Sequence, residues 1–342
     1  MSKLNYRNNT DEGQFTTLFP QLVIDAIEQT FGMVLDGVMT PYPSYINRVF
    51  GLTDENGNRF VVKYYRPGRW SPEAIKEEHE YLSDCAQAEI PVVTPILDSE
   101  GETLHELVLE NNGSDVTYYF SLFPLKAGRN FEANSDDDWL RLGSLIGRVH
   151  SVGKTKKCVH RLECLPEKTT HPFFMELQKK EMVTPDEREE FYGLIEHGLK
   201  LITPLFEQVA CHRIHGDCHA GNILDRANEG LLLFDFDDMM DGLAIQDLWL
   251  LLPDHAHKSM KEINLLIEGY QQFCPFDNST LKLIEPLRFM RMVYFLVWCA
   301  RQQSDYDFSR HFPGWGTKAF WFQEIEDFRA QIGIIEEILD EV

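Results

Sequence analysis

The feature that most constrains this chain is a polar loop between two short apolar stretches, IHGDCHAGNIL at 214–224. Within it, Asp217 and Asn222 carry side-chain oxygens and stand 5 residues apart. The later stretch LLLFDFDD at 231–238 adds the carboxylate of Asp235, 13 residues beyond Asn222. Apolar runs of this length predict buried strands, and strands on both sides of a tight loop would hold the three oxygens near one point. We therefore expect the fold to be built around this loop.

The residue types in the loop predict phosphoryl transfer. Magnesium prefers oxygen ligands and is bound by one or two carboxylates together with substrate phosphates. A carboxylate beside such an ion can orient and deprotonate an attacking hydroxyl, as in the Asp-x4-Asn catalytic loop of kinases. Asp and Asn near a glycine also occur in ordinary turns, because their side chains hydrogen-bond to their own backbone. The full pattern HGDxHxGN, followed by an apolar run ending in Asp235, is much more restrictive than an isolated HGD.

Length and charge set the class of protein. A chain of 342 residues is longer than most single domains, so we expect two lobes. Its 43% hydrophobic residues are enough for substantial cores. The 55 acidic and 32 basic residues give a net charge of -23, which repels nucleic acid and anionic membrane surfaces. Neither is an expected partner.

The compartment is predicted from the absence of sorting signals in the sequence. The first residues, MSKLNYRNNTDEGQ, lack an apolar signal core, and the longest apolar run, 292–300, is too short to cross a bilayer. Seven cysteines are an odd number in a chain without a secretion signal, so we expect reduced thiols rather than a disulfide framework. We expect a cytoplasmic monomer.

The N-terminal part is predicted to be a helix followed by antiparallel strands. Apolar residues at helical spacing predict the helix from about residue 20. Three β-rich segments follow, and Asn56-Gly57 between the second and third is typical of a hairpin. The first turn, 41–46, lies where a nucleotide kinase has its phosphate-covering loop, although it contains no glycine. Ser44 can offer a backbone N–H and a hydroxyl to a phosphate oxygen there, but an ordinary hairpin turn explains the sequence equally well.

Lys63 is the basic residue most suited to bind a phosphate. It ends the apolar run 60–62 and, by strand alternation, faces the same side as Val61. A lysine on the inner face of a strand is costly to bury unless it is paired. The acidic helix that starts at Ser71 offers Glu78 as a partner, as the strand lysine and helix glutamate pair in kinases. The alternative is a solvated acidic helix face with an extended surface lysine.

The remaining pattern changes from strands to helices near residue 124. Segments 91–98, 102–110 and 116–123 are predicted strands, and the proline and glycine of 124–130 suit a connector between lobes. We predict a nucleotide-binding lobe at 1–123, with adenine bound by the backbone around 121–123, and a catalytic and substrate lobe at 131–342. Helices are predicted to start at Ser135 and Thr184, and another to span 285–301.

These features together resemble the aminoglycoside/choline phosphotransferase superfamily of eukaryotic-like kinases, and within it the bacterial stress response kinase A family. The resemblance extends over about residues 40–300. It is carried by SYINRVF at 44–50, VVKYYRPGRW at 61–70, HGDCHAGNIL at 215–224, FDFDD at 234–238 and EPLRFMRMVYFLVW at 285–298.

The resemblance implies a two-lobed protein-kinase-like fold of the α+β class, with a small antiparallel-sheet N-lobe and a larger, mainly helical C-lobe. It also implies phosphorylation of serine or threonine in a protein substrate, with ATP and Mg²⁺. Carried over, Asp217 would be the catalytic proton acceptor, Asn222 and the catalytic Asp235 would bind magnesium, and Asp247 would brace the loop. The residues that would serve ATP binding are Lys63, Ser44 and Glu78, the last by pairing with Lys63.

The sequence departs from ordinary protein kinases at several points. It has no glycine-rich loop, no Ala-Pro-Glu segment, and Asp-Phe-Asp at 235–237 where Asp-Phe-Gly is usual. Control by phosphorylation of an activation loop is therefore not expected.

Three functions remain open from the sequence: a protein kinase, a kinase of small alcohols such as choline, homoserine or an aminoglycoside, and a catalytically silent nucleotide-binding module. The presence of Lys63, Asp217, Asn222 and Asp235 argues against the silent module. The Cys and His residues at 211–219 lack the close pairs typical of zinc sites, so we expect no structural zinc. The aromatic residues between 298 and 321 suit either a platform for a cationic substrate or core packing.

Overall fold

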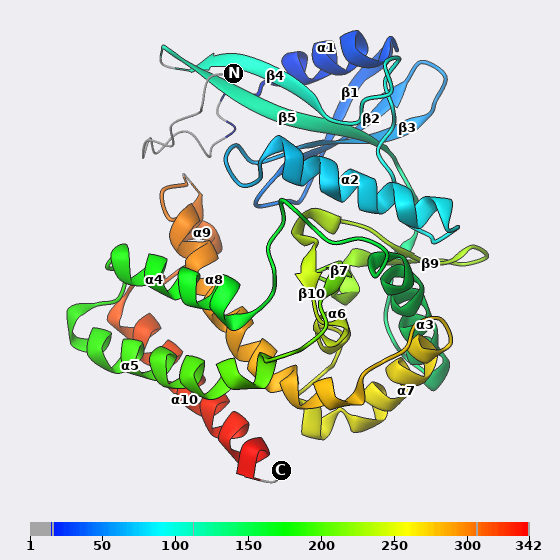
Figure 1. Ribbon diagram of the computed structural model, residues 1–342. Coiled ribbons are helices and arrows are strands. Elements are labelled where there is room, and N and C mark those ends of the chain that lie inside the picture. The colour runs from blue at the N-terminus through cyan, green and yellow to red at the C-terminus, as the bar shows by residue number, and fades with distance from the viewer. Residues whose placement is uncertain (1–14, 16, 112, 306, 341–342) are drawn as a thin grey trace. The chain divides into compact units, whose positions relative to one another are not determined.

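The computed structural model describes residues 15, 17–111, 113–305 and 307–340 (Figure 1). Its residues form two compact units. The sheet unit combines the chain up to Phe131 with Ile223–Asp237, and the helical unit combines Glu132–Asn222 with the chain from Asp238 onward. An antiparallel sheet in one unit and a mainly helical second unit confirm the predicted α+β class. The lobe limits at 123 and 131 stay a prediction.

The sheet unit is built on two antiparallel sheets. One has the strand order β1-β2-β3-β5-β4, and the other the order β6-β8-β9. The predicted hairpin at Asn56-Gly57 joins β2 to β3. The strands are β1 (Leu35–Tyr42), β2 (Arg48–Asp54), β3 (Arg59–Tyr64), β4 (His105–Asn111), β5 (Ser114–Pro124), β6 (Arg129–Asn130), β8 (Ile223–Arg226) and β9 (Gly230–Leu233).

The strand predicted at 91–98 is wrong. This segment makes an isolated bridge between Val92 and Leu233 and single hydrogen bonds to two strands, from Leu233 N to Pro91 O at 3.0 Å and from Ile96 N to Leu122 O at 2.7 Å. Pro91 and Pro95 have no backbone N–H to donate, so the segment cannot form a continuous ladder. It runs beside the sheets as an extended connection.

Two helices cover opposite faces of the five-stranded sheet, α1 (Pro20–Phe31) and α2 (Pro72–Gln87) (Figure 1). Val62 of β3 is fully buried in one core with Val23 of α1. Because side chains alternate along a strand, the neighbouring Lys63 faces the other side, toward α2. The predicted start of α2 is confirmed, since the Ser71 side chain accepts a hydrogen bond from Ala74 N and caps the helix.

The helical unit contains the remaining helices and one small sheet, in which β7 pairs with β10. The helix starts predicted near Ser135 and Thr184 and the block at 285–301 are confirmed. Its elements are α3 (Asp136–Gly153), α4 (His171–Lys179), α5 (Pro185–Ile202), α6 (Ala244–Trp249), α7 (Met260–Gln271), α8 (Ile284–Gln302), α9 (Phe308–His311), α10 (Lys318–Asp340), β7 (His212–Ile214) and β10 (Met240–Gly242). Short turns of helix occupy Pro166–Thr170, Thr203–Phe206, Ala220–Asn222, Ala256–Lys258 and Asn278–Leu283 in this unit, and a further one, Phe236–Asp238, begins in the sheet unit.

Close packing of α3 on α7 fixes a buried polar pair. A Cβ at Gly143 of α3 would lie 2.0 Å from the carbonyl oxygen of Leu266, so only glycine permits this approach. About two turns further along α3, His150 Nδ1 lies 3.1 Å from the Tyr270 hydroxyl of α7. The ring of His150 is thereby held in place inside the helical unit.

The C-terminal aromatic residues pack against one another rather than forming a fully exposed surface. Trp321 of α10 is fully buried and lies edge-on to Phe191 of α5, with ring centroids 5.3 Å apart. Trp298 and Phe312 are half-buried, with centroids 5.6 Å apart. The core-packing interpretation therefore holds for Trp321. In the described part of the chain, no helix is both long enough and apolar enough to span a bilayer.

Candidate active site

The predicted site residues fall into two groups, one in each unit. In the sheet unit, Lys63 is buried, with only 10% of its side chain exposed. Its Nζ lies 2.9 Å from Asp235 Oδ1 and 3.2 Å from Asp237 Oδ1. The predicted partner Glu78 of α2 lies at 4.0 Å, and its side chain is 2% exposed. Lys63 thus points inward, into a cluster of carboxylates.

The carboxylates keep Lys63 charged. Burial alone would lower the pKa of this lysine, but the negative charges of Asp235, Asp237 and Glu78 outweigh it and raise the pKa well above its ordinary value. The side chain is therefore a fixed cation at any physiological pH.

Asp235 adopts an unusual backbone conformation. It lies two residues beyond the end of β9 and has φ of +62°, in the left-handed region that residues other than glycine seldom occupy. Its neighbour Phe236 is buried edge-on against Tyr81 of α2, at 5.6 Å between centroids, which anchors the turn. The Asp235 carboxylate remains 48% exposed. Such strained positions concentrate at functional sites, and this one presents an oxygen pair to solvent beside Lys63.

Asp237 and Arg69 were not selected from the sequence. Asp237 is 4% exposed, and its Oδ2 accepts hydrogen bonds from Arg69 Nη1 at 2.6 Å and from Asn47 Nδ2 at 3.2 Å. The replacement of the usual glycine by Asp237 was visible in the sequence as a departure. A buried acid at that position requires a buried cation, which Arg69 of the YRPGRW segment provides.

Ser44 lies in the turn between β1 and β2, as predicted. Its Oγ accepts a hydrogen bond from Asn47 N at 3.3 Å, which is a usual contact in a turn. The hydroxyl hydrogen is still able to donate to another acceptor. A role for Ser44 in phosphate binding stays a prediction.

In the helical unit, the loop that carries Asp217 is held by Asp247 of α6. Asp247 accepts hydrogen bonds from His215 N at 2.7 Å and from Gly216 N at 2.8 Å, and lies 2.9 Å from His150 Nε2. All three are buried contacts of a side chain that is 1% exposed. The bracing role that the resemblance implies for Asp247 is confirmed by these bonds.

Gly216 is required by the shape of this loop. Its φ is +84°, and a Cβ there would lie 2.1 Å from the carbonyl oxygen of Asp238. The close approach turns the chain sharply between β7 and the following residue, Asp217.

Arg291 of α8 is the main partner of Asp217. Its Nη2 donates to Asp217 Oδ1 at 2.6 Å, and His219 Nε2 lies 3.5 Å from Oδ2. Burial alone would raise the pKa of the Asp217 carboxyl, but the hydrogen bond from His219 and the charge of Arg291 outweigh it and lower the pKa well below its usual range. Asp217 is therefore ionised and able to accept a hydrogen bond.

Asn222 is oriented by the same loop. Its Nδ2 donates to the Asp217 carbonyl oxygen at 2.9 Å, and its backbone N donates to His219 O at 2.9 Å. With the amide nitrogen engaged, Oδ1 is the atom left to bind a cation. The structure thus brings Asp217 and Asn222 together in one unit and Asp235, Lys63 and Glu78 in the other. Convergence of Asp235 with Asp217 and Asn222 stays a prediction.

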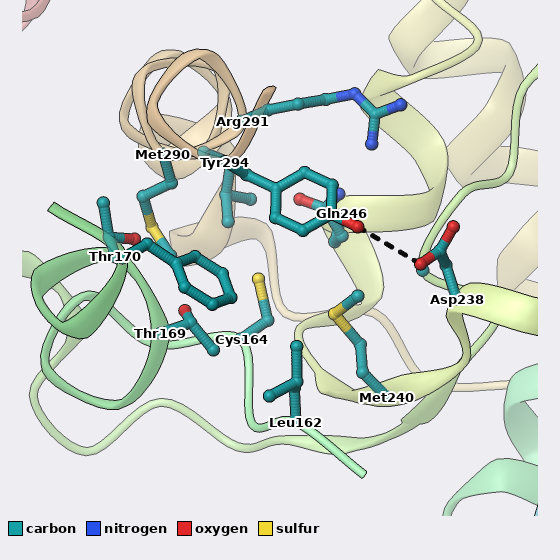
Figure 2. Close-up of a pocket in the computed structure, with 13 residues that line it drawn as sticks. Leu162, Cys164, Thr169, Thr170, Asp238, Met240, Gln246, Met290, Arg291 and Tyr294 are labelled. Carbon is teal, nitrogen blue, oxygen red and sulfur yellow. Dashed lines mark hydrogen bonds between the residues drawn. The ribbon is translucent and has the colours of Figure 1, made fainter. Parts of the chain in front are cut away.

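A small pocket of about 50 Å³ lies beside the Asp217 loop in the helical unit. Its lining is mostly apolar, but Gly216, Arg291 and Asp238 also contribute to it. Figure 2 shows Arg291, Gln246 and Asp238 grouped on one side, and the Tyr294 hydroxyl directed at Asp238, to which it donates a hydrogen bond of 3.3 Å. Arg291 both lines the pocket and pairs with Asp217, so a molecule in the pocket would contact the residue that holds that carboxylate.

Among the described residues, no three His, Cys, Asp or Glu side chains form a group that could hold a metal ion. Asp235 and Asn222 each carry an oxygen donor of the type that magnesium prefers, and a metal role for either residue stays a prediction.

Comparison with known proteins identifies the family. Residues 38–280 match the family model described as "phosphotransferase enzyme family". Stress response kinase A of Escherichia coli strain K12 is 36% identical over 337 residues, which cover 96% of this chain and 97% of that protein. The chain belongs to the stress response kinase A family. Another relative, serine/threonine protein kinase RdoA of Salmonella typhimurium strain LT2, is 36% identical over 331 residues with the same coverage. As a member of the stress response kinase A family, the chain is a phosphotransferase.

Solved structures share the fold of this stress response kinase A family member. Amicoumacin kinase hAmiN, in complex with AMP-PNP, Ca²⁺ and Ami, superposes with a TM-score of 0.69 at 19% identity, over 90% of this chain and 93% of that one. A microcompartment-associated aminopropanol kinase superposes with a TM-score of 0.66 at 14% identity, over 93% and 97%. At such low identities the likeness establishes the kinase-like fold alone.

Proposed function

We propose that this phosphotransferase transfers the γ-phosphate of ATP, bound with magnesium, to a serine or threonine hydroxyl of a protein. The observation that carries the proposal is the loop of Asp217 and Asn222, braced by buried bonds to Asp247, in a chain 36% identical to a protein named as a serine/threonine kinase. Catalysis of phosphoryl transfer consists mainly of positioning and electrostatic stabilisation, and both depend on such rigid support.

The sheet unit would bind the nucleotide phosphates. Lys63, as a buried cation, would contact phosphate oxygens, with Glu78 fixing its position. Ser44 would donate its hydroxyl to a phosphate from the turn between β1 and β2. The exposed carboxylate of Asp235 would ligate magnesium, which when bound neutralises charge on the transferring phosphate.

The helical unit would activate the acceptor. Asp217 is ionised, and it would orient the acceptor hydroxyl and take its proton as the hydroxyl oxygen bonds to the γ-phosphorus and ADP leaves. Arg291 would hold that carboxylate in a fixed orientation through the 2.6 Å contact. Asn222 would add its Oδ1 to the magnesium ligands, since its amide nitrogen is held by the Asp217 carbonyl.

The pocket beside Asp217 supports a second candidate, a small alcohol as acceptor. A space of about 50 Å³ admits a small group, and the carboxylate of Asp238 would attract a cationic one. The name of the relative serine/threonine protein kinase RdoA favours a protein acceptor, whose side chain could enter the same pocket.

Incubation with γ-labelled ATP and magnesium separates the candidates. The purified protein is offered a basic protein mixture and, separately, a panel of small alcohols that includes choline, homoserine and an aminoglycoside. Label on serine or threonine of protein supports the proposal, while label on an alcohol alone supports the second candidate. Label on neither, with ATP bound, would leave the silent module. The Asp217→Asn variant serves as the control for contaminating kinases.

A further inference from the structure

Lys63 is surrounded by more negative than positive charge. Carboxylate oxygens of Asp235 and Asp237 lie 2.9 and 3.2 Å from its Nζ, and one of Glu78 lies at 4.0 Å. A single ammonium group facing three carboxylates would leave the cluster unfavourable for an anionic phosphate, because like charges repel strongly where water is largely excluded. The cluster therefore needs additional positive charge before it can bind a nucleotide.

Arg69 supplies part of that charge. Its Nη1 lies 2.6 Å from Asp237 Oδ2, and the two side chains are 15% and 6% exposed. Asp237 is thus shared, with one oxygen on Arg69 and the other facing Lys63. Arg69 on Asp237 and a divalent cation on Asp235 would leave less negative charge to compete with phosphate for Lys63.

Asp237 also holds the turn that carries Ser44. Its Oδ2 accepts from Asn47 Nδ2 at 3.2 Å, and the backbone N of Asn47 donates to Ser44 Oγ at 3.3 Å. The Asn47 side-chain oxygen in turn accepts from Arg66 N at 3.1 Å. One buried carboxylate therefore links the turn after β1, the lysine of β3 and the loop that leads to α2.

We propose that Arg69 and Asp237 are positioning residues that leave the charge of Lys63 available to nucleotide phosphates. The inference rests on the proposed function, since phosphates must bind at Lys63 for it to hold. Without Arg69, the carboxylate of Asp237 would compete with nucleotide phosphates for Lys63. Removing the charges of both Arg69 and Asp237 would remove that competition. Charge compensation, rather than bulk, is the property that the pair contributes.

A set of variants tests this by nucleotide titration calorimetry in the presence of magnesium. Arg69→Met should weaken ATP binding by about tenfold, within the usual range of coupling between sites. The double variant Arg69→Met/Asp237→Asn should recover most of that loss, and Arg69→Lys should bind nearly as the wild type does. Adenosine, which has no phosphates, should bind all variants equally. Lys76→Met, which removes an exposed cation paired with Glu102 in the same unit, is the matched control and should change nothing.

Each outcome is decisive. ATP affinity unchanged in Arg69→Met would overturn the inference while leaving the proposed function intact. The inference would also be overturned if the double variant bound ATP as weakly as Arg69→Met does, or if Arg69→Met lost as much affinity for adenosine as for ATP. Either result would assign Arg69 a purely structural role. If Arg69→Met does not fold, as judged by its melting temperature, the double variant takes its place: ATP affinity close to that of the wild type supports the inference, and an affinity about tenfold weaker overturns it. Wild-type protein that binds no ATP would overturn both the proposed function and the inference.

Discussion

Asp247 offers the sharpest test of how the loop around Asp217 is held. Its two oxygens accept buried hydrogen bonds from the backbone N–H groups of His215 and Gly216, at 2.7 and 2.8 Å, and one of them also meets His150 Nε2 at 2.9 Å. Hydrogen bonds to a charged group contribute about 1.5–3 kcal/mol each, and a buried donor left without a partner is costly. Asp247→Ala should therefore lower the free energy of unfolding by about 4 kcal/mol.

Asp247→Asn separates the loss of charge from the loss of both acceptors. The amide retains one acceptor oxygen, so about half of the destabilisation, ~2 kcal/mol, is expected. Either change should also let the loop move, and a displacement of about 1 Å at Asp217 is enough to lower kcat by ~10²-fold.

The assay is urea unfolding followed by tryptophan fluorescence, combined with steady-state kinetics. Trp249 of α6 is 5% exposed and lies two residues from the substitution, so it reports on this region. Asp25→Asn, which removes an exposed carboxylate on α1, is the control and should stay within about 0.5 kcal/mol of the wild type. Equal stability of Asp247→Ala and the control, with unchanged kcat, would refute the bracing argument.

Three further changes have defined outcomes. Gly216→Ala should abolish most phosphotransfer and lower the melting temperature. The new Cβ would lie 2.1 Å from the carbonyl oxygen of Asp238, on a residue whose φ is +84°. Wild-type activity in this variant would show that the loop can relax. Glu285 is fully buried and, although burial would raise its pKa, hydrogen bonds from Gln331, Ala256 N and His255 lower it. Glu285→Ala should thus lower the free energy of unfolding by about 3–5 kcal/mol near neutral pH. A carboxyl whose pKa is lower in the folded state than in the unfolded state stabilises the fold only above the unfolded pKa, so the difference between wild type and variant should shrink as pH falls below about 4.5. Denaturant titrations at several pH values would detect this change. Burial and the nearby charge of Asp327 raise the pKa of Glu324 to about 7, so the wild type loses stability as pH rises from the unfolded value toward 7. Glu324→Gln should consequently be more stable than the wild type at pH 8 and no more stable than the wild type at pH 4. An equal difference in the free energy of unfolding at both pH values would contradict the raised pKa of Glu324.

Local signals in the sequence predicted much of the fold. Ser71 before proline and Ser135 before three acidic residues mark the starts of α2 and α3, because capping depends only on neighbouring residues. The hairpin at Asn56-Gly57 is similarly local. The prediction of a strand at 91–98 was wrong. Its apolar residues are typical of a strand, but Pro91 and Pro95 have no backbone N–H to donate to a neighbouring strand.

The site was predictable where one motif contained its parts. Asp217 and Asn222 lie in one loop, and Lys63 is a buried basic residue on a strand. Arg291 was missed because it pairs with Asp217 across 74 residues of sequence, and Asp237 was missed because its meaning depends on Arg69, 168 residues away. Such long-range pairs leave no periodic trace, although a charged residue within an apolar helix such as α8 marks a place to look.

The central claim is that Asp217 takes the proton of the acceptor hydroxyl. Its most direct test is the turnover of Asp217→Asn with ATP and magnesium, measured beside nucleotide affinity and beside the exposed-site control Asp137→Asn on α3. The account predicts that kcat falls by ~10²–10⁴-fold while ATP binding is preserved and the control is unaffected. Turnover close to that of the wild type in Asp217→Asn would contradict it.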